Sequence, residues 1–279
     1  MIEWSAYPLT GTGQPGEAEL KVSRDILSPQ LRNYRDILVA LPPAYEESGA
    51  GHPVIYLQDG QNLFDPVTSY AGDWGLVDTL NRLTPDRPQP ILVGVPNMGR
   101  RRRYEYSPFR DIIHGGGGGD RYLAFLVETV KPLVDASFRT RPERSHTVIA
   151  GSSLGALISL YGLYRYAEVF GAGSVQSPAL WFADGAVLRF VEEMSSLAVG
   201  RVHLDVGTEE GPEALLDVRA LKRLLITAGH RLGDDLSYAE EEGADHDEVS
   251  WGRRFRLAMP FLPIGKRSER SAVLASGEN

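Results

Sequence analysis

The stretch "TVIAGSSLGALISLYGLY", residues 147–164, decides the fold class. It starts with the apolar run Val-Ile-Ala, passes through Gly-Ser-Ser-Leu-Gly and continues as a long run of apolar, mostly helix-forming residues. This order predicts a buried strand, a tight turn and a helix that packs against a sheet. The turn matches the pattern G-x-S-x-G with Ser153 at its centre, which marks either a catalytic serine or a tight turn without chemistry.

Similar apolar runs, bounded by Gly and Pro, alternate with helical patterns along the rest of the chain. They predict strands at 33–45, 52–60, 89–97, 146–153, 171–178, 201–211 and 236–246. Helical patterns occupy 75–83, 120–138, 154–170, 213–229 and 246–262. Because strands alternate with helices, we expect an α/β fold with a mostly parallel central sheet and helices on both faces.

The domain organisation follows from where this pattern begins and ends. We expect one domain over residues 1–262. Its first segment, 1–25, is rich in Gly, Pro and polar residues and should form an N-terminal arm that could hold one strand. The tail at 263–279 is polar and rich in small residues, so we expect it to be flexible.

The composition narrows the classes of partner. The chain has 279 residues, and its 29 Lys+Arg against 37 Asp+Glu give a formal net charge of −8. This acidic balance argues against nucleic acid or an anionic membrane surface as the main partner. The chain contains no Cys, which excludes disulfides and thiolate metal sites.

The location is also an expectation from composition. No stretch approaches the roughly 20 consecutive apolar residues that a membrane-spanning helix needs. The first residues lack the basic segment and the apolar core of a secretory leader. We therefore expect a soluble, cytoplasmic protein, and the oligomeric state stays open.

A serine in a sharp strand-to-helix turn needs space around it. Gly151 and Gly155 stand two residues before and two residues after Ser153, where larger residues would collide with the strand and the helix. The backbone N–H of Leu154 opens the following helix, where N–H groups are free and the helix dipole is positive. That N–H could therefore stabilise an oxyanion.

A serine alcohol is a weak nucleophile without a base, and the best-placed histidine is His246. It follows the last predicted strand, within "GADHDE", and lies at the edge of the sheet where the Ser153 turn lies. His52 and His146 precede strands and belong to the opposite edge. His203 lies inside a predicted strand and is expected in the core.

The base in turn needs an acid that orients it. The segment "DVGTEEG" offers three carboxylates, namely Asp205, Glu209 and Glu210. Asp205 lies inside the predicted strand and is the weakest candidate, whereas the two glutamates follow the strand end. The residues alone leave the choice between Glu209 and Glu210 open, but the order serine, acid, histidine is that of a known class of hydrolases.

A second oxyanion donor should come from the loop after an earlier strand. The segment "YLQDGQNLFD" fits, because Asp59-Gly60 ends the strand and the N–H of Gln61 would point into the site. The alternative is a simple Asp-Gly turn.

These segments together resemble the "Putative esterase" family of α/β-hydrolases, which includes enterochelin esterases, feruloyl esterase domains, esterase D and the mycolyltransferases. The resemblance covers about residues 25–262. It rests on "SPQLRNYRDILVALPPAY", "VIYLQDGQNLFD", "VGVPNMGRRRRYEYSPF", "IAGSSLGALISLYGLYRYAEVFGAGSVQSPALWF", "LDVGTEEG" and "GADHDEVSWGRRF". The enterochelin-esterase-like branch is the most similar.

The resemblance implies a role for each of five residues. Ser153 would be the nucleophile, His246 the base and Glu210 the acid. The backbone amides of Gln61 and Leu154 would form the oxyanion hole. The sequence departs from the family in having Ala156 where members often have a second glycine after the turn, but alanine is small enough to fit there.

Other residues could select the substrate. We expect the substrate pocket to be lined by Asp59, Asn62, Tyr106, Trp181 and Phe182. The last two of these could instead pack in the core. The arginine run 100–103 could receive an anionic or catecholate substrate, or it could be a solvated charge run with one arginine paired to Glu105. The glycine run 115–119 lacks the Gly-Lys-Ser/Thr end of a phosphate-binding loop, so it is either a mobile loop near the site or a flexible connector.

The expected function is hydrolysis of a small-molecule carboxylic ester through an acyl-enzyme, without a cofactor or a metal. No group of His, Asp and Glu has metal-ligand spacing, and "DHDE" at 245–248 is interpreted as the loop of the base. Two alternatives remain, namely acyl transfer to an acceptor other than water and a binding protein that keeps the fold without activity. The natural ester stays open among siderophore, feruloyl, acetyl-sugar and small aliphatic esters.

Overall fold

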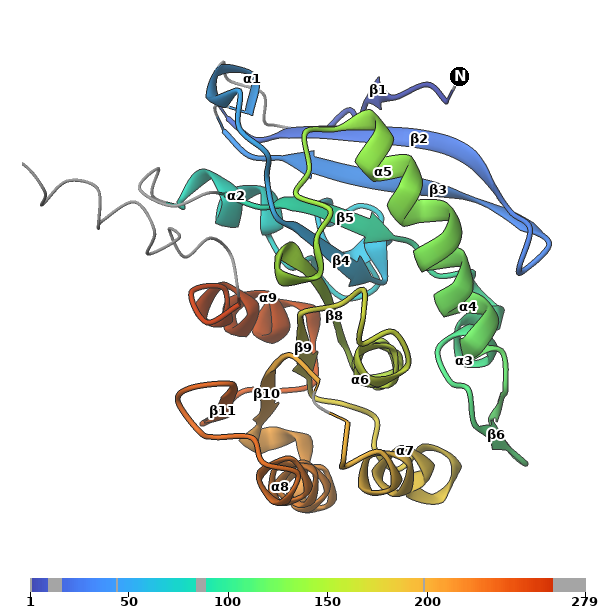
Figure 1. Cartoon of the computed structure of the whole chain (residues 1–279), viewed down its shortest axis with the longest axis vertical. Helices are drawn as coiled ribbons and strands as arrows, with labels where there is room; N and C mark the ends of the chain where they lie inside the picture. The colour runs from blue at the N-terminus through green and yellow to red at the C-terminus, as the bar shows by residue number, and fades with distance from the viewer. Residues whose placement is uncertain (1, 10–16, 44, 84–88, 198, 263–279) are drawn as a thin grey trace, which may run out of the picture.

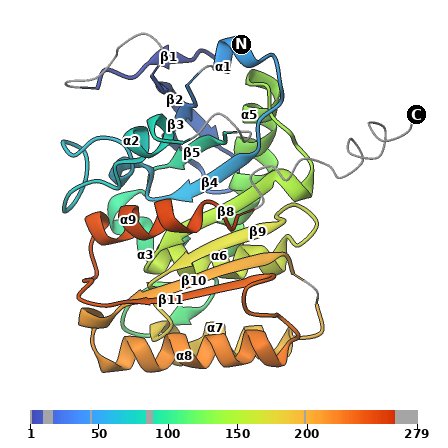
Figure 2. The same cartoon turned by 90° about the vertical axis from the view of Figure 1, so that its left-hand side faces the viewer.

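The computed structural model describes residues 2–9, 17–43, 45–83, 89–197 and 199–262, and within them nine strands form one sheet. The strand order is β1-β2-β3-β5-β4-β8-β9-β10-β11, as Figure 2 shows. The strands are β1 (Ser5–Ala6), β2 (Glu19–Ser28), β3 (Asn33–Leu41), β4 (Val54–Gln58), β5 (Ile91–Val95), β8 (Thr147–Ser152), β9 (Ala172–Gln176), β10 (Arg201–Gly207) and β11 (Leu236–Glu241). The first three strands and the β3–β5 pair are antiparallel, and all the later pairs are parallel. The expected α/β-hydrolase fold with a mostly parallel sheet is therefore confirmed.

The helices cover both faces of this sheet (Figure 1). They are α1 (Tyr45–Ser48), α2 (Leu76–Asn81), α3 (Arg102–Glu105), α4 (Gly119–Phe125), α5 (Lys131–Ser137), α6 (Leu154–Arg165), α7 (Phe182–Glu193), α8 (Pro212–Thr227) and α9 (Glu248–Ala258). A π-helical turn, Leu126–Val130, joins α4 to α5. Helices α2 and α9 lie on one face, and α4, α5 and α6 lie on the other.

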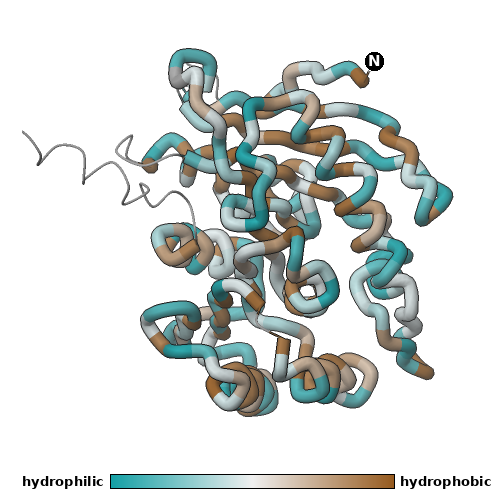
Figure 3. Tube along the Cα trace, in the orientation of Figure 1, coloured by the Kyte–Doolittle hydropathy of each residue, from teal (hydrophilic) through white to brown (hydrophobic). Residues whose placement is uncertain are grey.

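The alternation of side chains along the central strands explains the two layers of core. In β4, Ile55 and Leu57 pack with residues of α2 and α9, whereas Val54 and Tyr56 pack with residues of α4 to α8. Every residue of this strand is buried, which is why its sequence is a continuous apolar run rather than an alternating one. Figure 3 shows the hydrophobic segments gathered along the sheet and the hydrophilic ones at the outer turns.

The ends of the chain differ in part from the expectation. The N-terminal arm of residues 1–25 holds β1 and the first part of β2, so much of it belongs to the sheet. The expected flexible tail, 263–279, lies outside the described residues. Helix α7 and a two-stranded hairpin of β6 (Arg110–Asp111) and β7 (Gly115–Gly116) had no sequence signal that predicted them.

The parallel strands place several chain segments at one edge of the sheet. Strands β4, β8, β10 and β11 run in the same direction, so the residues that follow Gln58, Ser152, Gly207 and Glu241 all emerge there. In open α/β sheets this carboxyl edge is where ligands bind. Of the helices in the described parts of the chain, none is long and apolar enough to cross a membrane.

Candidate active site

Ser153 occupies a strained turn between β8 and α6. Its backbone has φ 56° and ψ −123°, a region that residues other than glycine rarely adopt. A Cβ atom on Gly151 would lie 2.7 Å from the backbone of Gly155, and one on Gly155 would lie 2.9 Å from Cβ of Gln58. Both glycines are therefore required by close approach, and the turn holds the Ser153 side chain out at the carboxyl edge of the sheet.

Three side chains from separate segments form one hydrogen-bonded chain at this edge. Nε2 of His246 lies 3.1 Å from Oγ of Ser153, and Nδ1 lies 2.7 Å from Oε2 of Glu210. An ionised carboxylate can only accept, so Nδ1 carries the proton of the neutral ring. Nε2 is then left as the acceptor that faces the serine hydroxyl.

The position of Glu210 is decided by a short 3₁₀ turn, Thr208–Glu210, that follows β10. The turn points Glu210 back under the loop of His246, and its side chain is only 2% exposed. Glu209 is exposed, and its backbone N–H donates to the Ala244 carbonyl. Asp205 stays within the strand, where Oδ2 accepts from Nε2 of the buried His203 across 2.9 Å.

The carboxylate of Glu210 receives donors on both oxygens. Oε1 accepts from the Gly207 N–H at 2.7 Å and from the Ser177 hydroxyl at 2.6 Å, while Oε2 faces His246. Burial by itself would raise the pKa of Glu210. The hydrogen bonds from His246, Ser177 and Gly207 outweigh that effect and hold the pKa below its ordinary value. The group is therefore kept as a negative charge next to the imidazole.

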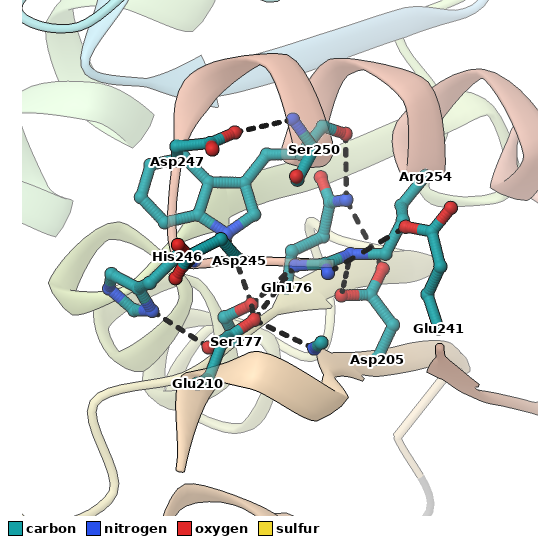
Figure 4. Close-up of polar contacts among 12 residues, drawn as sticks. Gln176, Ser177, Asp205, Glu210, Glu241, Asp245, His246, Asp247, Ser250 and Arg254 are labelled. Atoms are coloured by element: carbon teal, nitrogen blue, oxygen red, sulfur yellow. Dashed lines mark hydrogen bonds and ion pairs between the residues drawn. The ribbon is translucent and has the colours of Figure 1, made fainter. Parts of the chain in front are cut away.

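Ser177, just after β9, connects Glu210 to helix α9 (Figure 4). Its Oγ accepts from Nε1 of Trp251 at 3.0 Å and from Nη2 of Arg254 at 2.5 Å. With its one proton donated to Glu210, the hydroxyl uses all of its hydrogen-bonding capacity. The same Trp251 ring packs edge-on against His246, with the ring centroids 4.8 Å apart.

A buried guanidinium underlies this network. Arg254 lies 3.0 Å from Oδ1 of Asp205, 3.2 Å from Oε1 of Glu210 and 3.8 Å from Oε2 of Glu241. It is 3% exposed and serves the buried Asp205 and Glu210, while Glu241 also pairs with Arg253 at 2.7 Å. Arg254 is thus a main reason that so many acidic groups can lie together behind the site.

The two candidate oxyanion donors both lie at the start of a helical turn. Leu154 is the first residue of α6, and Gln61 is the second residue of the 3₁₀ turn Gly60–Asn62. N–H groups at these positions have no acceptor within their own helix. A Cβ atom on Gly60 would lie 2.6 Å from the Gly94 backbone, so glycine lets this turn pack closely against β5.

Asp59, at the end of β4, is part of a rigid ion pair. Its backbone has φ 55°, and its carboxylate accepts two hydrogen bonds from Arg102, each 2.8 Å long. Nδ2 of Asn97 donates to the same carboxylate at 2.6 Å. This anchor fixes the strand end from which Gln61 projects.

The arginine run therefore divides into one structural residue and three exposed ones. Arg102 is held by Asp59, while Arg100, Arg101 and Arg103 are exposed. The alternative that one arginine of the run pairs with Glu105 is wrong. Glu105 is fully buried and pairs with Arg35 at 3.0 Å, because its side chain points into the core rather than along the run.

A cleft of about 800 Å³ opens over the candidate nucleophile. Its lining combines polar groups with exposed loop residues: Asp59, Gln61, Asn62, Thr68, Ser69, Tyr70, Ala71, Asn97, Arg102, Arg103, Ser152, Ser153, His246, Glu248 and Trp251. Asp59 and Asn62 thus lie where the sequence analysis expects them. Tyr106, Trp181 and Phe182 are not among the lining residues.

The three aromatic residues that were expected in the pocket lie outside the lining of the cleft. Tyr106 is fully buried, and its hydroxyl accepts from the Asp59 N–H at 2.9 Å, so it supports the cleft from below. Phe182 is also fully buried. Trp181 is exposed and packs edge-on against His114, with the ring centroids 5.2 Å apart.

The glycine run 115–119 packs against the segment 104–108. The Gly118 N–H donates to the Tyr104 carbonyl at 2.9 Å, and a Cβ atom on Gly118 would lie 2.4 Å from the Tyr104 ring. A Cβ atom on Gly119 would lie 2.5 Å from the nitrogen of Pro108. These glycines let the segment that leads into α4 approach α3 closely.

Comparison with known proteins identifies the family. Residues 28–262 match the family described as "Putative esterase". The chain belongs to that family. With this membership it is a carboxylic ester hydrolase, and the expected resemblance is confirmed.

The relatives of this esterase extend over most of its length. A Bacillus subtilis relative, the uncharacterized protein YbbA, is 26% identical over 258 residues, covering 87% of this chain and 98% of the relative. The siderophore enterobactin esterase of Emericella nidulans is 27% identical over 213 residues, covering 67% of this chain and 66% of the relative. Among solved structures, an IroE-like serine hydrolase from Shewanella oneidensis has a TM-score of 0.71 at 22% identity, covering 87% of this chain and 80% of the other, and so shares the fold.

Sequence reasoning missed three residues of this site. Ser177, just after β9, and Arg254 on α9 contact Glu210, and Glu248 lies in the wall of the cleft. Only Glu248 had a local signal, because it stands two residues after His246 in "DHDE". Among the described residues, no group of three or more His, Asp or Glu side chains could hold a metal ion.

Proposed function

We propose that this esterase acts as a serine hydrolase with Ser153 as nucleophile, His246 as base and Glu210 as orienting acid. The observation that carries the proposal is the chain of hydrogen bonds from Ser153 Oγ through His246 to Glu210, at 3.1 Å and 2.7 Å. Both distances allow direct proton transfer or orientation without a bridging water.

In the first half-reaction, Nε2 of His246 accepts the proton of the Ser153 hydroxyl while Oγ attacks the ester carbonyl carbon. The carbonyl oxygen becomes an oxyanion, which the N–H groups of Gln61 and Leu154 stabilise. The imidazolium then gives its proton to the leaving alcohol oxygen, and the C–O bond breaks. Glu210 stabilises the imidazolium and holds Nδ1 protonated throughout.

In the second half-reaction, a water molecule attacks the acyl carbon of the Ser153 ester. His246 takes a proton from that water and returns it to Oγ, which releases the carboxylic acid and restores the serine. The tight strand-to-helix turn supports this role, because it holds Oγ in one place for both steps. The substrate is a small-molecule ester, and the siderophore enterobactin esterase among the relatives makes a siderophore ester one candidate.

The direct test is hydrolysis of p-nitrophenyl butyrate by the purified protein. We expect turnover by the wild type and a loss of at least about 10³-fold in kcat/KM for Ser153→Ala and for His246→Ala. Ser196→Ala, which changes an exposed serine outside the cleft, is the matched control and should retain most of the activity. Equal rates for wild type and Ser153→Ala would contradict the proposal.

Covalent labelling provides an independent readout that does not depend on the substrate. A fluorophosphonate should label the wild type at Ser153, with the peptide identified by mass spectrometry. Labelling of Ser153→Ala at the same rate as the wild type would also contradict the assignment of the nucleophile.

A further inference from the structure

The wall of the cleft contains a carboxylate that the proposed mechanism does not use. Glu248 is the first residue of α9, two residues after His246, and its side chain lines the cleft although the residue is only 5% exposed. Oε1 accepts a hydrogen bond from Nδ2 of Asn62 across 3.0 Å. Asn62 in turn belongs to the 3₁₀ turn that presents Gln61.

Within the described parts of the chain, Glu248 forms no close ion pair, and the charge of Arg102 acts on it only at longer range. Asp59 in the same wall differs, because Arg102 binds it with two hydrogen bonds. Burial and the nearby charges of Asp59 and Asp247 raise the pKa of Glu248. A buried carboxylate without a close ion pair lowers stability, and a hydroxyl group of a ligand in the cleft would supply it with a further hydrogen bond.

The chemistry of the wall restricts what Glu248 could bind. A carboxylate accepts hydrogen bonds from hydroxyl or ammonium groups. Arg102 and Arg103 line the same cleft, and Arg103 is exposed and forms no ion pair with a described residue. Arg102 is neutralised by Asp59, whereas the unpaired guanidinium of Arg103 disfavours a cationic ligand, so the structure favours a neutral hydroxyl group as the donor.

The position of Glu248 relative to His246 tells which part of the substrate it faces. The leaving oxygen of the alcohol must reach Nε2 of His246 to receive its proton. The alcohol portion therefore lies near His246, and Glu248 lines the same cleft two residues further along the chain. The hydrogen bond from Asn62 holds the glutamate in the wall of the cleft, so its carboxylate is pre-oriented for a donor.

We propose that Glu248 is a specificity-determining residue that accepts a hydrogen bond from a hydroxyl group on the alcohol portion of the ester. The preferred substrates are then esters of polyhydroxylated alcohols rather than esters of plain alkanols. The inference rests on the proposed function, since it takes His246 as the group that protonates the leaving alcohol.

The experiment compares two esters that differ only in hydroxyl groups. The kcat/KM values for glycerol monobutyrate and propyl butyrate are measured with wild type, Glu248→Gln and Glu248→Ala. Glu242→Gln, an exposed glutamate on the loop before His246, is the matched control. We expect the wild type to prefer the glycerol ester, and Glu248→Ala to lower the glycerol-to-propyl ratio by about tenfold. Glu248→Gln keeps an acceptor oxygen, so its glycerol-to-propyl ratio should lie between those of the wild type and Glu248→Ala. The ratio of Glu242→Gln should match that of the wild type.

The glycerol-to-propyl ratio of kcat/KM distinguishes recognition of the substrate hydroxyl by Glu248 from a purely structural role of this residue. If Glu248 only supports the turn of Asn62, both esters lose activity equally and the ratio stays unchanged, which would overturn the inference. A wild-type ratio near one would overturn it as well, and so would a preference for butyrylcholine that Glu248→Ala removes, because the ligand would then be a cation. Failure of the proposed function is distinct, since the wild type would then hydrolyse neither butyrate ester nor p-nitrophenyl butyrate.

Discussion

Ser177 donates a hydrogen bond across 2.6 Å to the oxygen of Glu210 that His246 does not use. The carboxylate is thus fixed at both ends, by a histidine that is 43% exposed at the rim and by a buried serine beneath. Because Ser177 is itself held by Trp251 and Arg254, the orientation of Glu210 depends on helix α9 as well as on its own turn. Support of this kind keeps an orienting acid within the narrow geometry that its role requires.

Replacing Ser177 with alanine should lower activity and stability together. One donor to Glu210 is lost, so the pKa of Glu210 should rise toward its ordinary value, and two buried donors on α9 lose their acceptor. We expect about a tenfold fall in kcat and a loss of about 1–3 kcal/mol in the free energy of unfolding, measured by p-nitrophenyl butyrate kinetics and urea unfolding. Ser196→Ala, at an exposed serine, serves as the control. An unchanged kcat in Ser177→Ala would show that Glu210 does not need this support.

The two neighbouring glutamates should respond very differently to loss of charge. Glu210→Gln removes the negative charge that stabilises the imidazolium and replaces one carboxylate oxygen with an amide that donates, so we expect kcat to fall by about 10²–10⁴-fold. Glu209→Gln changes an exposed side chain and should remain within about twofold of the wild type, because surface substitutions of this kind rarely disturb a site. Both variants are assayed at the same pH with a fluorophosphonate titration of active sites. A larger fall in kcat for Glu209→Gln than for Glu210→Gln would assign the role of the orienting acid to Glu209.

The two buried carboxylates should change stability with pH in opposite directions. The pKa of Glu248 is raised, so between its ordinary value near 4.5 and its native value the folded protein binds more protons than the unfolded chain. Stability then falls as pH rises through that window. Glu248→Gln should therefore have a higher Tm than the wild type at pH 7.5 and a similar Tm at pH 4.

The pKa of Glu210 is lowered, so its effect on the pH dependence of stability is opposite to that of Glu248. Its contribution to stability is present above the ordinary value near 4.5 and is lost as pH falls through the native pKa. Glu210→Gln should thus have a lower Tm than the wild type at pH 7.5, with a smaller difference at acidic pH. Calorimetry of both variants across pH 4–8 checks the pair, with Glu242→Gln as the exposed control. Changes of Tm in the same direction at pH 7.5 in Glu248→Gln and Glu210→Gln would contradict the opposite pKa shifts of the two carboxyl groups.

Arg254 should be the most damaging arginine to replace on α9. Arg254→Met keeps much of the volume but leaves the buried carboxylates of Asp205 and Glu210 without their shared guanidinium. Breaking a buried ion pair by removing one partner costs about 3–5 kcal/mol of unfolding free energy. Arg256→Met, at an exposed position on the same helix, should change it by less than about 0.5 kcal/mol. Urea unfolding of the two variants measures the difference, and similar losses in both would contradict the role of Arg254.

The local part of this architecture could be predicted from the sequence. The strand, the glycine-bounded turn and the helix at 147–164 follow from apolar runs and two glycines, and the structure places β8 and α6 there. The parallel central sheet followed for the same reason, because each buried strand has its own apolar run. Helix α7 escaped prediction because three residues of positive φ, 183–185, interrupt its start and its apolar pattern is short.

The part that could not be predicted depends on contacts between distant segments. Whether Glu209 or Glu210 faces His246 is decided by a single 3₁₀ turn, and a pattern has no signal for that one-residue difference. Ser177 and Arg254 are 77 residues apart, and only folding brings them together. Trp181 and Tyr106 were expected in the pocket for their chemistry, but packing places one at the surface and the other beneath Asp59.

The segment that begins helix α9 is synthesised later than the rest of the candidate site. His246 and Glu248 flank the N-terminus of this helix, and His246 is 93 residues further along the chain than Ser153. During synthesis the strand-to-helix turn therefore leaves the ribosome well before the histidine that would activate its serine. A nascent chain that ends before residue 246 has the proposed nucleophile but lacks the proposed base, so we expect it to hydrolyse no ester at this site until α9 docks.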